Sequence, residues 1–146
     1  MKETESSYLR ELIRVLVRNL GILEKGESVC CGVTIPQCHA IVEIGRAQKI
    51  SLNRLAEILT LDKSTMSRTI NNLVENDFAI RKLHSDDRRF VTIKLTDKGI
   101  GVFKNIEGSM EEYYRKILRS IPEHKREQVL ESLKLLVKAV NQNKCC

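Results

Sequence analysis

The stretch that decides the fold is residues 51–76, with the sequence SLNRLAEILTLDKSTMSRTINNLVEN. Ser51 precedes a short run of helical periodicity, and Asp62 precedes a second run that continues to about Asn76. Ser and Asp are residues that commonly cap helix N-termini, so each marks the start of a helix. Two short helices joined by about four residues predict a helix-turn-helix.

The second of these helices, the predicted recognition helix, separates apolar from polar residues. Its predicted inner face consists of Met66, Ile70, Leu73 and Val74. Its predicted outer face carries hydroxyl, amide and guanidinium groups from Ser64, Thr65, Ser67, Arg68, Asn71 and Asn72. These groups supply the donors and acceptors that base edges and phosphates require in a major groove. An ordinary solvated helix surface is the alternative, but such a surface usually contains more Glu and Lys.

The periodicity then changes from helical to strand-like. Residues 78–83 and 90–95 are two strand-like runs, and the polar stretch HSDDRR at 84–89 lies between them. Arg88 and Arg89 at this hairpin tip are suited to enter a minor groove or to hold phosphates, and Asp87 is suited to orient them. A charged turn that only aids solubility is the alternative. A hairpin placed directly after a recognition helix predicts a wing.

Long helical patterns flank this module on both sides. One helix is predicted over about 7–23, and a second opens at Thr34-Ile35-Pro36-Gln37, which combines a Thr cap, an early Pro and a capping-box Gln. Two more are predicted from Thr96 and from Pro122 onward. These flanking helices are too long and too apolar for the small winged module alone, so we expect a two-fold homodimer. The predicted fold is mainly α with a small β-hairpin wing.

Composition limits the classes of function. The net charge is +6 and the isoelectric point is near 9.2. Residues 46–98 contain eleven Lys/Arg against seven Asp/Glu, which favours a polyanionic partner for this part. The chain shows neither an apolar stretch of roughly 18 residues nor a secretory signal, so a cytoplasmic protein without membrane contact is expected.

An enzyme is not expected from the sequence. The chain lacks a glycine-rich phosphate loop, an H-E-x-x-H motif and a G-x-S-x-G elbow. Cys38 and His39 are adjacent, so on a helix their side chains point in different directions. No cofactor is required by this interpretation, although a metal or metalloid effector is compatible with it.

The module resembles the MarR family of winged helix-turn-helix transcriptional regulators. The similarity lies in LAEIL at 55–59, LDKSTMSRTI at 61–70, LVE at 73–75, DRR at 87–89 and IKLTDKG at 93–99. The last two match the D-x-R and L-T-x-x-G signatures of that family. These motifs cover about residues 50–100, and the order of the flanking helices agrees over the whole chain.

The resemblance implies a single MarR-type domain over 1–146. Residues 46–98 would form its DNA-binding part, and 5–45 and 99–146 would form dimerisation helices. It also implies an obligate homodimer that binds a pseudo-palindromic operator in double-stranded DNA. By position, Arg89 matches the wing-tip arginine and Asp87 the residue that braces it. The residues that match the contacting part of the recognition helix are Ser64, Thr65, Ser67 and Arg68. Family members usually repress transcription and are released by a ligand, an oxidant or a metal.

The cysteines suggest what such a regulator would sense. Cys30 and Cys31 are expected in the loop between the first two helices, Cys38 near the start of the second, and Cys145 and Cys146 end the chain. Two or three thiolates would suit a soft metal or a metalloid such as arsenite, with His39 as an added ligand. Thiol oxidation, zinc binding with Glu24 or Glu43, and no sensing role are the alternatives.

Two further alternatives concern the effector and the partner. An aromatic carboxylate or phenol could bind in a crevice between the DNA-binding and dimerisation regions, with Arg10, Arg14 and Arg46 as candidate cations. A winged-helix interaction module without DNA binding would instead have lost its polar recognition face and its wing arginines. Ser64, Arg68 and the arginine pair at 88–89 argue against that module.

Overall fold

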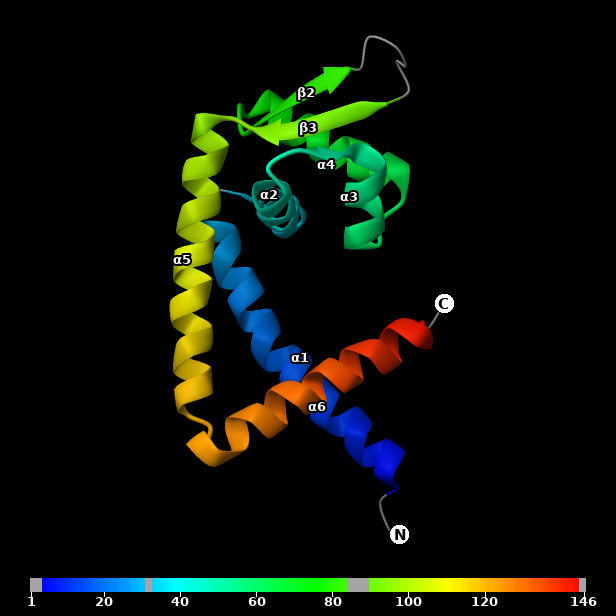
Figure 1. Cartoon of the computed structure of the whole chain (residues 1–146), viewed down its shortest axis with the longest axis vertical. Coiled ribbons are helices and arrows are strands. Elements are labelled where there is room, and N and C mark those ends of the chain that lie inside the picture. Colours follow the sequence, from blue (N-terminus) through cyan, green and yellow to red (C-terminus); the bar gives the residue numbers. More distant parts are fainter. Residues whose placement is uncertain (1–3, 31–32, 84–89, 145–146) are drawn as a thin grey trace. The chain divides into compact units, whose positions relative to one another are not determined.

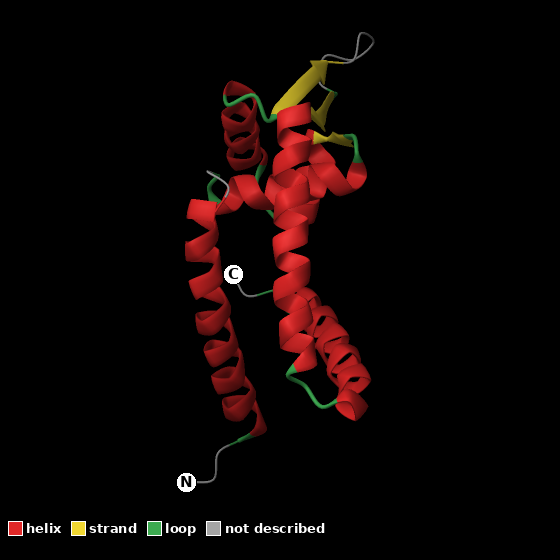
Figure 2. Ribbon diagram, turned by 90° about the vertical axis from the view of Figure 1, so that its left-hand side faces the viewer, coloured by secondary structure: helices red, strands yellow, loops and turns green. Residues whose placement is uncertain are grey.

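The computed structural model describes residues 4–30, 33–83 and 90–144, with side chains only as far as residue 20 in the first range. Most of the described chain is helical, and three short strands form one antiparallel sheet (Figures 1 and 2). The elements are α1 (Glu5–Cys30), α2 (Ile35–Ala47), β1 (Ile50–Ser51), α3 (Leu52–Leu59), α4 (Lys63–Glu75), β2 (Ala79–Leu83), β3 (Val91–Leu95), α5 (Asp97–Arg119) and α6 (Glu123–Gln142). The predicted fold class is therefore confirmed. The chain divides into two compact units, Met1–Glu107 and Gly108–Cys146.

The helix caps that begin α2, α3 and α4 are those that the sequence predicted. At α2, the backbone N–H of Gln37 donates to Thr34 Oγ1 at 3.3 Å, and the N–H of Thr34 donates to Gln37 Oε1 at 2.9 Å. At α3, the N–H of Arg54 donates to Ser51 Oγ at 3.1 Å. Each cap satisfies backbone donors that the first helical turn leaves without a partner.

The first helix is longer than the sequence suggested. The prediction ended it at residues 24–27, whereas α1 continues to Cys30. A single Gly costs a helix only about 1 kcal/mol relative to Ala, and Gly26 is flanked by Glu and Lys, which are good helix formers. Cys30 consequently lies in the last turn of α1 and not in the loop that was expected to carry it.

A single core joins α2, α3, α4 and the sheet. Its largest fully buried side chains are Ile41, Ile44, Leu55, Met66, Ile70, Leu73 and Ile93. They come from one face of each helix and from the central strand. The helices of this core therefore pack on the face of the sheet to which Ile93 points (Figure 1).

The sheet has the order β1-β3-β2, with β3 in the centre. Arg81 of β2 and Ile50 of β1 both pair with Ile93 of β3, from its two sides. The sequence predicted the β2–β3 hairpin but not β1, because a two-residue strand shows no alternation. β1 runs directly into the Ser51 cap of α3, so it attaches the wing sheet to the helix-turn-helix.

The start of α5 is tied to the turn between α4 and β2. Thr96 Oγ1 donates to the carbonyl oxygen of Asp77 at 2.6 Å and accepts from the N–H of Gly99 at 3.0 Å. Lys98 Nζ donates to the carbonyl oxygen of Asn76 at 3.0 Å and lies 4.7 Å from the centre of the Phe78 ring. These contacts explain the T-x-x-G pattern at 96–99, because the hydroxyl caps the helix and the glycine permits close approach.

The second unit contains the rest of α5 and the whole of α6. Arg126 Nε donates to the carbonyl oxygen of Ile121 at 2.9 Å, which fixes the chain reversal before α6. Apolar side chains of α6 remain exposed: Leu130, Leu133, Leu135, Val137 and Val140. Among residues 4–30, 33–83 and 90–144, no helix combines the length and the apolar character needed to cross a bilayer.

Candidate nucleic-acid interface

Helix α4 begins at a dense N-cap. The Asp62 carboxylate accepts from the N–H of Thr65 at 2.6 Å and from Ser64 Oγ at 3.1 Å. Hydrogen bonding from the Thr65 side chain, then from its backbone N–H and from Ser64, lowers the pKa of Asp62, and the nearby Arg68 charge adds to this. Asp62 therefore stays ionised and fixes the direction of the two hydroxyl-bearing residues that follow it.

The predicted outer face of α4 reaches solvent. Ser64, Arg68, Asn71 and Asn72 are exposed, and Thr65 and Ser67 are partly exposed. All six occupy one helix of 13 residues whose opposite face is fixed in the core. The described structure thus brings these predicted residues together on a single rigid surface.

One detail of the predicted faces of α4 was wrong. Val74 was assigned to the inner face but is 37% exposed. Thr69 of α4 is buried instead. Its hydroxyl donates to the carbonyl oxygen of Thr65 at 3.1 Å, so the polar group has a hydrogen-bond partner away from solvent. A hydroxyl that bonds back to its own helix can occupy a core position that a hydrophobicity pattern does not assign to it.

Arg81 is a residue of this surface that the sequence analysis missed. It lies on β2, and its guanidinium donates from Nη2 to Oδ1 of Asn71 on α4. The bond links the sheet to the middle of the helix and turns the Asn71 amide nitrogen away from the guanidinium. The sequence did contain a signal for the direction of Arg81. Arg81 lies two residues after Ala79 in the same strand, so the two side chains share the face of the sheet on which Ala79 is buried.

Charge on the helix-turn-helix is partly neutralised. Arg54 of α3 pairs with Glu57 at 3.1 Å, so its charge is locally compensated. Arg68 forms no ion pair within 4.0 Å of another described residue, and Arg81 is bonded to a neutral amide. Arg68 and Arg81 consequently leave net positive charge beside the polar face of α4.

The predicted wing-tip residues Asp87, Arg88 and Arg89 lie outside the described residues. The two strands that lead to that segment, β2 and β3, end at Leu83 and begin at Val91. Their register, from Ala79–Leu95 to Leu83–Val91, confirms the predicted hairpin pairing of the two strands.

The predicted sensing residues are only partly described. Cys31, Cys145 and Cys146 lie outside the described residues, as does the side chain of Cys30. Cys38 is half-buried on α2, and His39 beside it is exposed. In the described ranges, no three His, Cys, Asp or Glu side chains gather closely enough to hold a metal ion.

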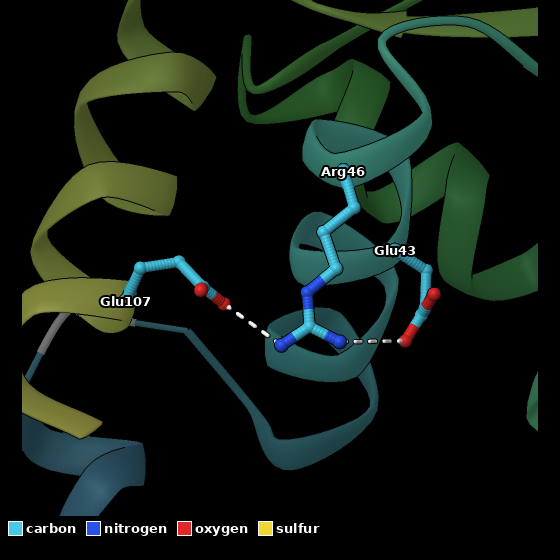
Figure 3. Close-up of polar contacts among 3 residues, drawn as sticks. All are labelled: Glu43, Arg46 and Glu107. Carbon is cyan, nitrogen blue, oxygen red and sulfur yellow. Dashed lines mark hydrogen bonds and ion pairs between the residues drawn. The ribbon is translucent and has the colours of Figure 1, made fainter. Parts of the chain in front are cut away.

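Two of the three candidate arginines for an anionic effector have carboxylate partners within the chain. Arg14 lies 3.6 Å from Glu11 on the surface of α1. Arg46 lies between Glu43 at 3.7 Å and Glu107 at 3.4 Å, which joins α2 to α5 (Figure 3). These pairs satisfy the two guanidinium groups within the described unit.

Comparison with known proteins agrees with this geometry. The model of the MarR family matches residues 33–91, from before α2 into β3. The chain is similar to the MarR family over this part. It is 25% identical to the HTH-type transcriptional regulator BilQ of Clostridium symbiosum, over 78% of this chain and 79% of BilQ. The family and this relative are transcriptional regulators, not enzymes.

Solved structures share the fold of this chain. FabT of Streptococcus pneumoniae, crystallised in complex with DNA, superposes with a TM-score of 0.83 at 20% identity, covering 93% of this chain and 99% of FabT. MepR of S. aureus, also in a DNA complex, gives a TM-score of 0.78 at 20% identity, covering 94% and 99% of the two chains. These likenesses confirm the winged helix-turn-helix architecture.

Proposed function

We propose that this MarR-family regulator acts as a homodimeric repressor that binds an operator in double-stranded DNA and leaves it when an effector binds. The observation that carries the proposal is the exposed face of α4, where hydroxyl, amide and guanidinium groups lie on a helix anchored in the core. A helix of this kind fits a major groove, and its side chains match the donors and acceptors of base edges. The FabT and MepR structures, both DNA complexes of the same fold, support this use of the helix.

The homodimer is supported by apolar surface that a single chain leaves in water. On α1 the exposed apolar residues are Tyr8, Leu9, Leu12, Leu16 and Val17. The exposed apolar residues of α6 add to this set, and exposed apolar patches commonly mark protein–protein interfaces. A second copy would bury such surfaces and would present two α4 helices to a pseudo-palindromic site.

Light scattering at several protein concentrations tests the dimer. We expect the mass of two chains for the wild type. The variant Leu12→Asp should lower that mass or make it depend on concentration, because it places a charge on the exposed face of α1. Arg14→Asp, two residues along the same helix, controls for the added carboxylate. A wild-type monomer at micromolar concentration would contradict the proposal.

A mobility-shift titration on the promoter of the chain's own gene tests DNA binding. We expect a saturable shift that competitor DNA of unrelated sequence does not remove, and Arg68→Glu should abolish it by placing a negative charge beside phosphates. Arg54→Glu, on α3, changes charge by the same amount at a residue that is already paired with Glu57. Equal loss for the two variants would point to a general charge effect and not to reading by α4.

For the effector, we keep the thiol proposal that the sequence suggested. Arsenite, zinc and peroxide would be added separately to the protein–DNA complex. Release that is lost in the variant carrying both Cys30→Ser and Cys31→Ser supports a thiol sensor. Release that is unchanged in that variant removes Cys30 and Cys31 from the mechanism, and no release with any of the three agents rejects the thiol proposal.

A further inference from the structure

A guanidinium and an amide meet at the edge of the polar face of α4. Arg81 of β2 donates from Nη2 to Oδ1 of Asn71, which lies in the second half of α4. Both residues are exposed, so the pair belongs to the surface that the helix presents to solvent. Arginine carries only donors, so the oxygen end of the Asn71 amide, and not its nitrogen end, faces Arg81.

This bond divides the hydrogen-bonding capacity of Asn71. An asparagine without a partner offers one acceptor oxygen and two N–H donors, and it can rotate to present either end. Here Arg81 occupies the oxygen, whereas no described residue accepts a hydrogen bond from Nδ2 of Asn71. A second donor at the oxygen would lie beside the positive guanidinium, which repels it. Asn71 therefore offers only donors to an outside ligand.

Arg68 adds further donors next to Asn71. The two residues are three apart on α4, and residues at this spacing are neighbours on a helix surface. Arg68 is exposed and carries five N–H donors and no acceptor. The carboxylate of Asp62, at the start of the same helix, already accepts from Thr65 and Ser64. Arg68 and Asn71 thus form a pair of neighbouring groups that only donate.

The four bases differ in how well they match such a pair. In the major groove guanine presents two acceptors, N7 and O6, whereas adenine presents one acceptor and one donor. Thymine presents one acceptor, and cytosine presents a donor. Asparagine commonly reads adenine through its oxygen and its nitrogen together, but that pairing needs the oxygen that Arg81 occupies. Guanine therefore matches best and cytosine least.

We propose that Arg81 makes Asn71 a reader of guanine at one base position in each operator half-site. Nδ2 of Asn71 would donate to O6 or N7 of that guanine, and Arg81 would be a positioning residue that acts through the Asn71 amide. The inference rests on the proposed function, because it names a base that the polar face of α4 reads. A bond that only braces β2 against α4 would leave the base preference unchanged.

Selection of duplexes with a randomised central segment by the full-length protein identifies the preferred bases. We expect the wild type to enrich a two-fold related sequence with guanine at one position in each half-site. Fluorescence anisotropy then gives the affinities for duplexes that carry guanine, adenine or cytosine at that position. The ratios of these affinities are the measurement, because a change of protein charge alters binding to all duplexes alike.

Asn71→Asp removes the donors of residue 71 and keeps an acceptor for Arg81. A carboxylate accepts from N4 of cytosine, so the ratio of guanine to cytosine affinity should fall about tenfold, and selection should move toward cytosine. A purely structural role of the bond predicts no such change, because the ion pair with Arg81 would hold the strand at least as firmly.

Arg81→Met frees the oxygen of Asn71 and should make adenine acceptable, so the ratio of guanine to adenine affinity should fall. Lys82→Met is the matched control, since it removes the same charge from the next residue of β2, whose side chain points to the opposite face. This control should keep the wild-type ratio. Should Asn71→Asp fold poorly, as judged by circular dichroism, Arg81→Met against Lys82→Met decides alone.

The outcomes separate this inference from the proposed function. A wild type that enriches no sequence would reject the proposed function, and this inference with it. A wild type that enriches an operator, while Asn71→Asp and Arg81→Met keep its base preferences, would retain the function and overturn the role of the pair. Equal changes for Arg81→Met and Lys82→Met would also overturn it, because the effect would then follow charge and not the bond to Asn71.

Discussion

Gly99 lies directly beneath the backbone carbonyl of Phe78. A Cβ added at Gly99 would overlap that carbonyl oxygen and would also lie 3.2 Å from Cβ of Leu95. The N–H of Gly99 is meanwhile held by Thr96 Oγ1, so the helix cannot move away without losing its cap. The glycine of the T-x-x-G pattern is therefore required by space and not by backbone dihedral angles.

Replacing Gly99 by Ala should lower the free energy of unfolding by about 1–3 kcal/mol, the usual cost of forced overpacking. Gly101→Ala is the matched control, since a Cβ there meets nothing within 4 Å and α5 is helical at both positions. The control should be neutral or up to about 1 kcal/mol more stable. Urea unfolding followed by circular dichroism measures both. Similar stabilities for the two variants would disprove the close contact.

Removal of the predicted wing-tip arginine should weaken DNA binding. We expect Arg89→Ala to reduce operator affinity at least tenfold, roughly 1.4 kcal/mol, while the dimer stays intact. Fluorescence anisotropy over a series of salt concentrations gives the affinity and the number of phosphate contacts, and the slope of the logarithmic plot should fall by about one. Lys125→Ala, at the start of α6, is the control. Normal affinity for Arg89→Ala would refute the wing assignment.

The bond between Arg81 and Asn71 should couple the wing sheet to α4 during DNA binding. Each single variant, Arg81→Ala or Asn71→Ala, is expected to weaken operator binding several-fold. The double variant should be little weaker than the worse single variant, because the second change removes a partner that is already lost. A double-mutant cycle of dissociation constants provides the test, and strictly additive effects would show that the two residues act separately.

The Asp62 cap should make the stability of the folded chain depend on pH. Hydrogen bonding lowers the pKa of Asp62 in the folded chain from the usual 3.8, so its stabilising effect is complete above that pH and is lost as the pH falls through the folded value. The wild type should exceed Asp62→Asn in stability at pH 7, and the difference should shrink at about pH 3.

Chemical unfolding at the two pH values measures this difference. Ser51→Ala removes the cap of α3, which carries no titrating group, and should cost about 1 kcal/mol at both pH values. A difference between wild type and Asp62→Asn that does not change with pH would mean that the carboxylate charge contributes nothing to the cap.

Local signals in the sequence predicted the fold well. The caps at Thr34, Ser51 and Asp62 are local contacts, because each side chain accepts from a backbone N–H three residues away. The sequence alone could therefore locate them. The polar face of α4 followed from helical periodicity in the same way. The core position of Thr69 and the exposure of Val74 could not be assigned, because both depend on which neighbouring element covers that side of the helix.

Contacts between distant segments were the ones that sequence reasoning missed. β1 has two residues and acquires its strand character only by pairing with β3. Arg81 reaches Asn71 across ten residues of sequence, from β2 to α4. Such groupings become visible only when the hairpin register and the packing of α2 on the sheet are known.

The ties from Thr96 and Lys98 to the turn after α4 have a mechanical consequence. Thr96 and Lys98, at the start of α5, donate three hydrogen bonds to the turn after α4, through the backbone oxygens of Asn76, Asp77 and Phe78. A displacement of the first turns of α5 is therefore expected to move the C-terminal end of α4 with it. In the proposed dimer on DNA, a molecule that tilts α5 would change the spacing of the two α4 helices along the duplex.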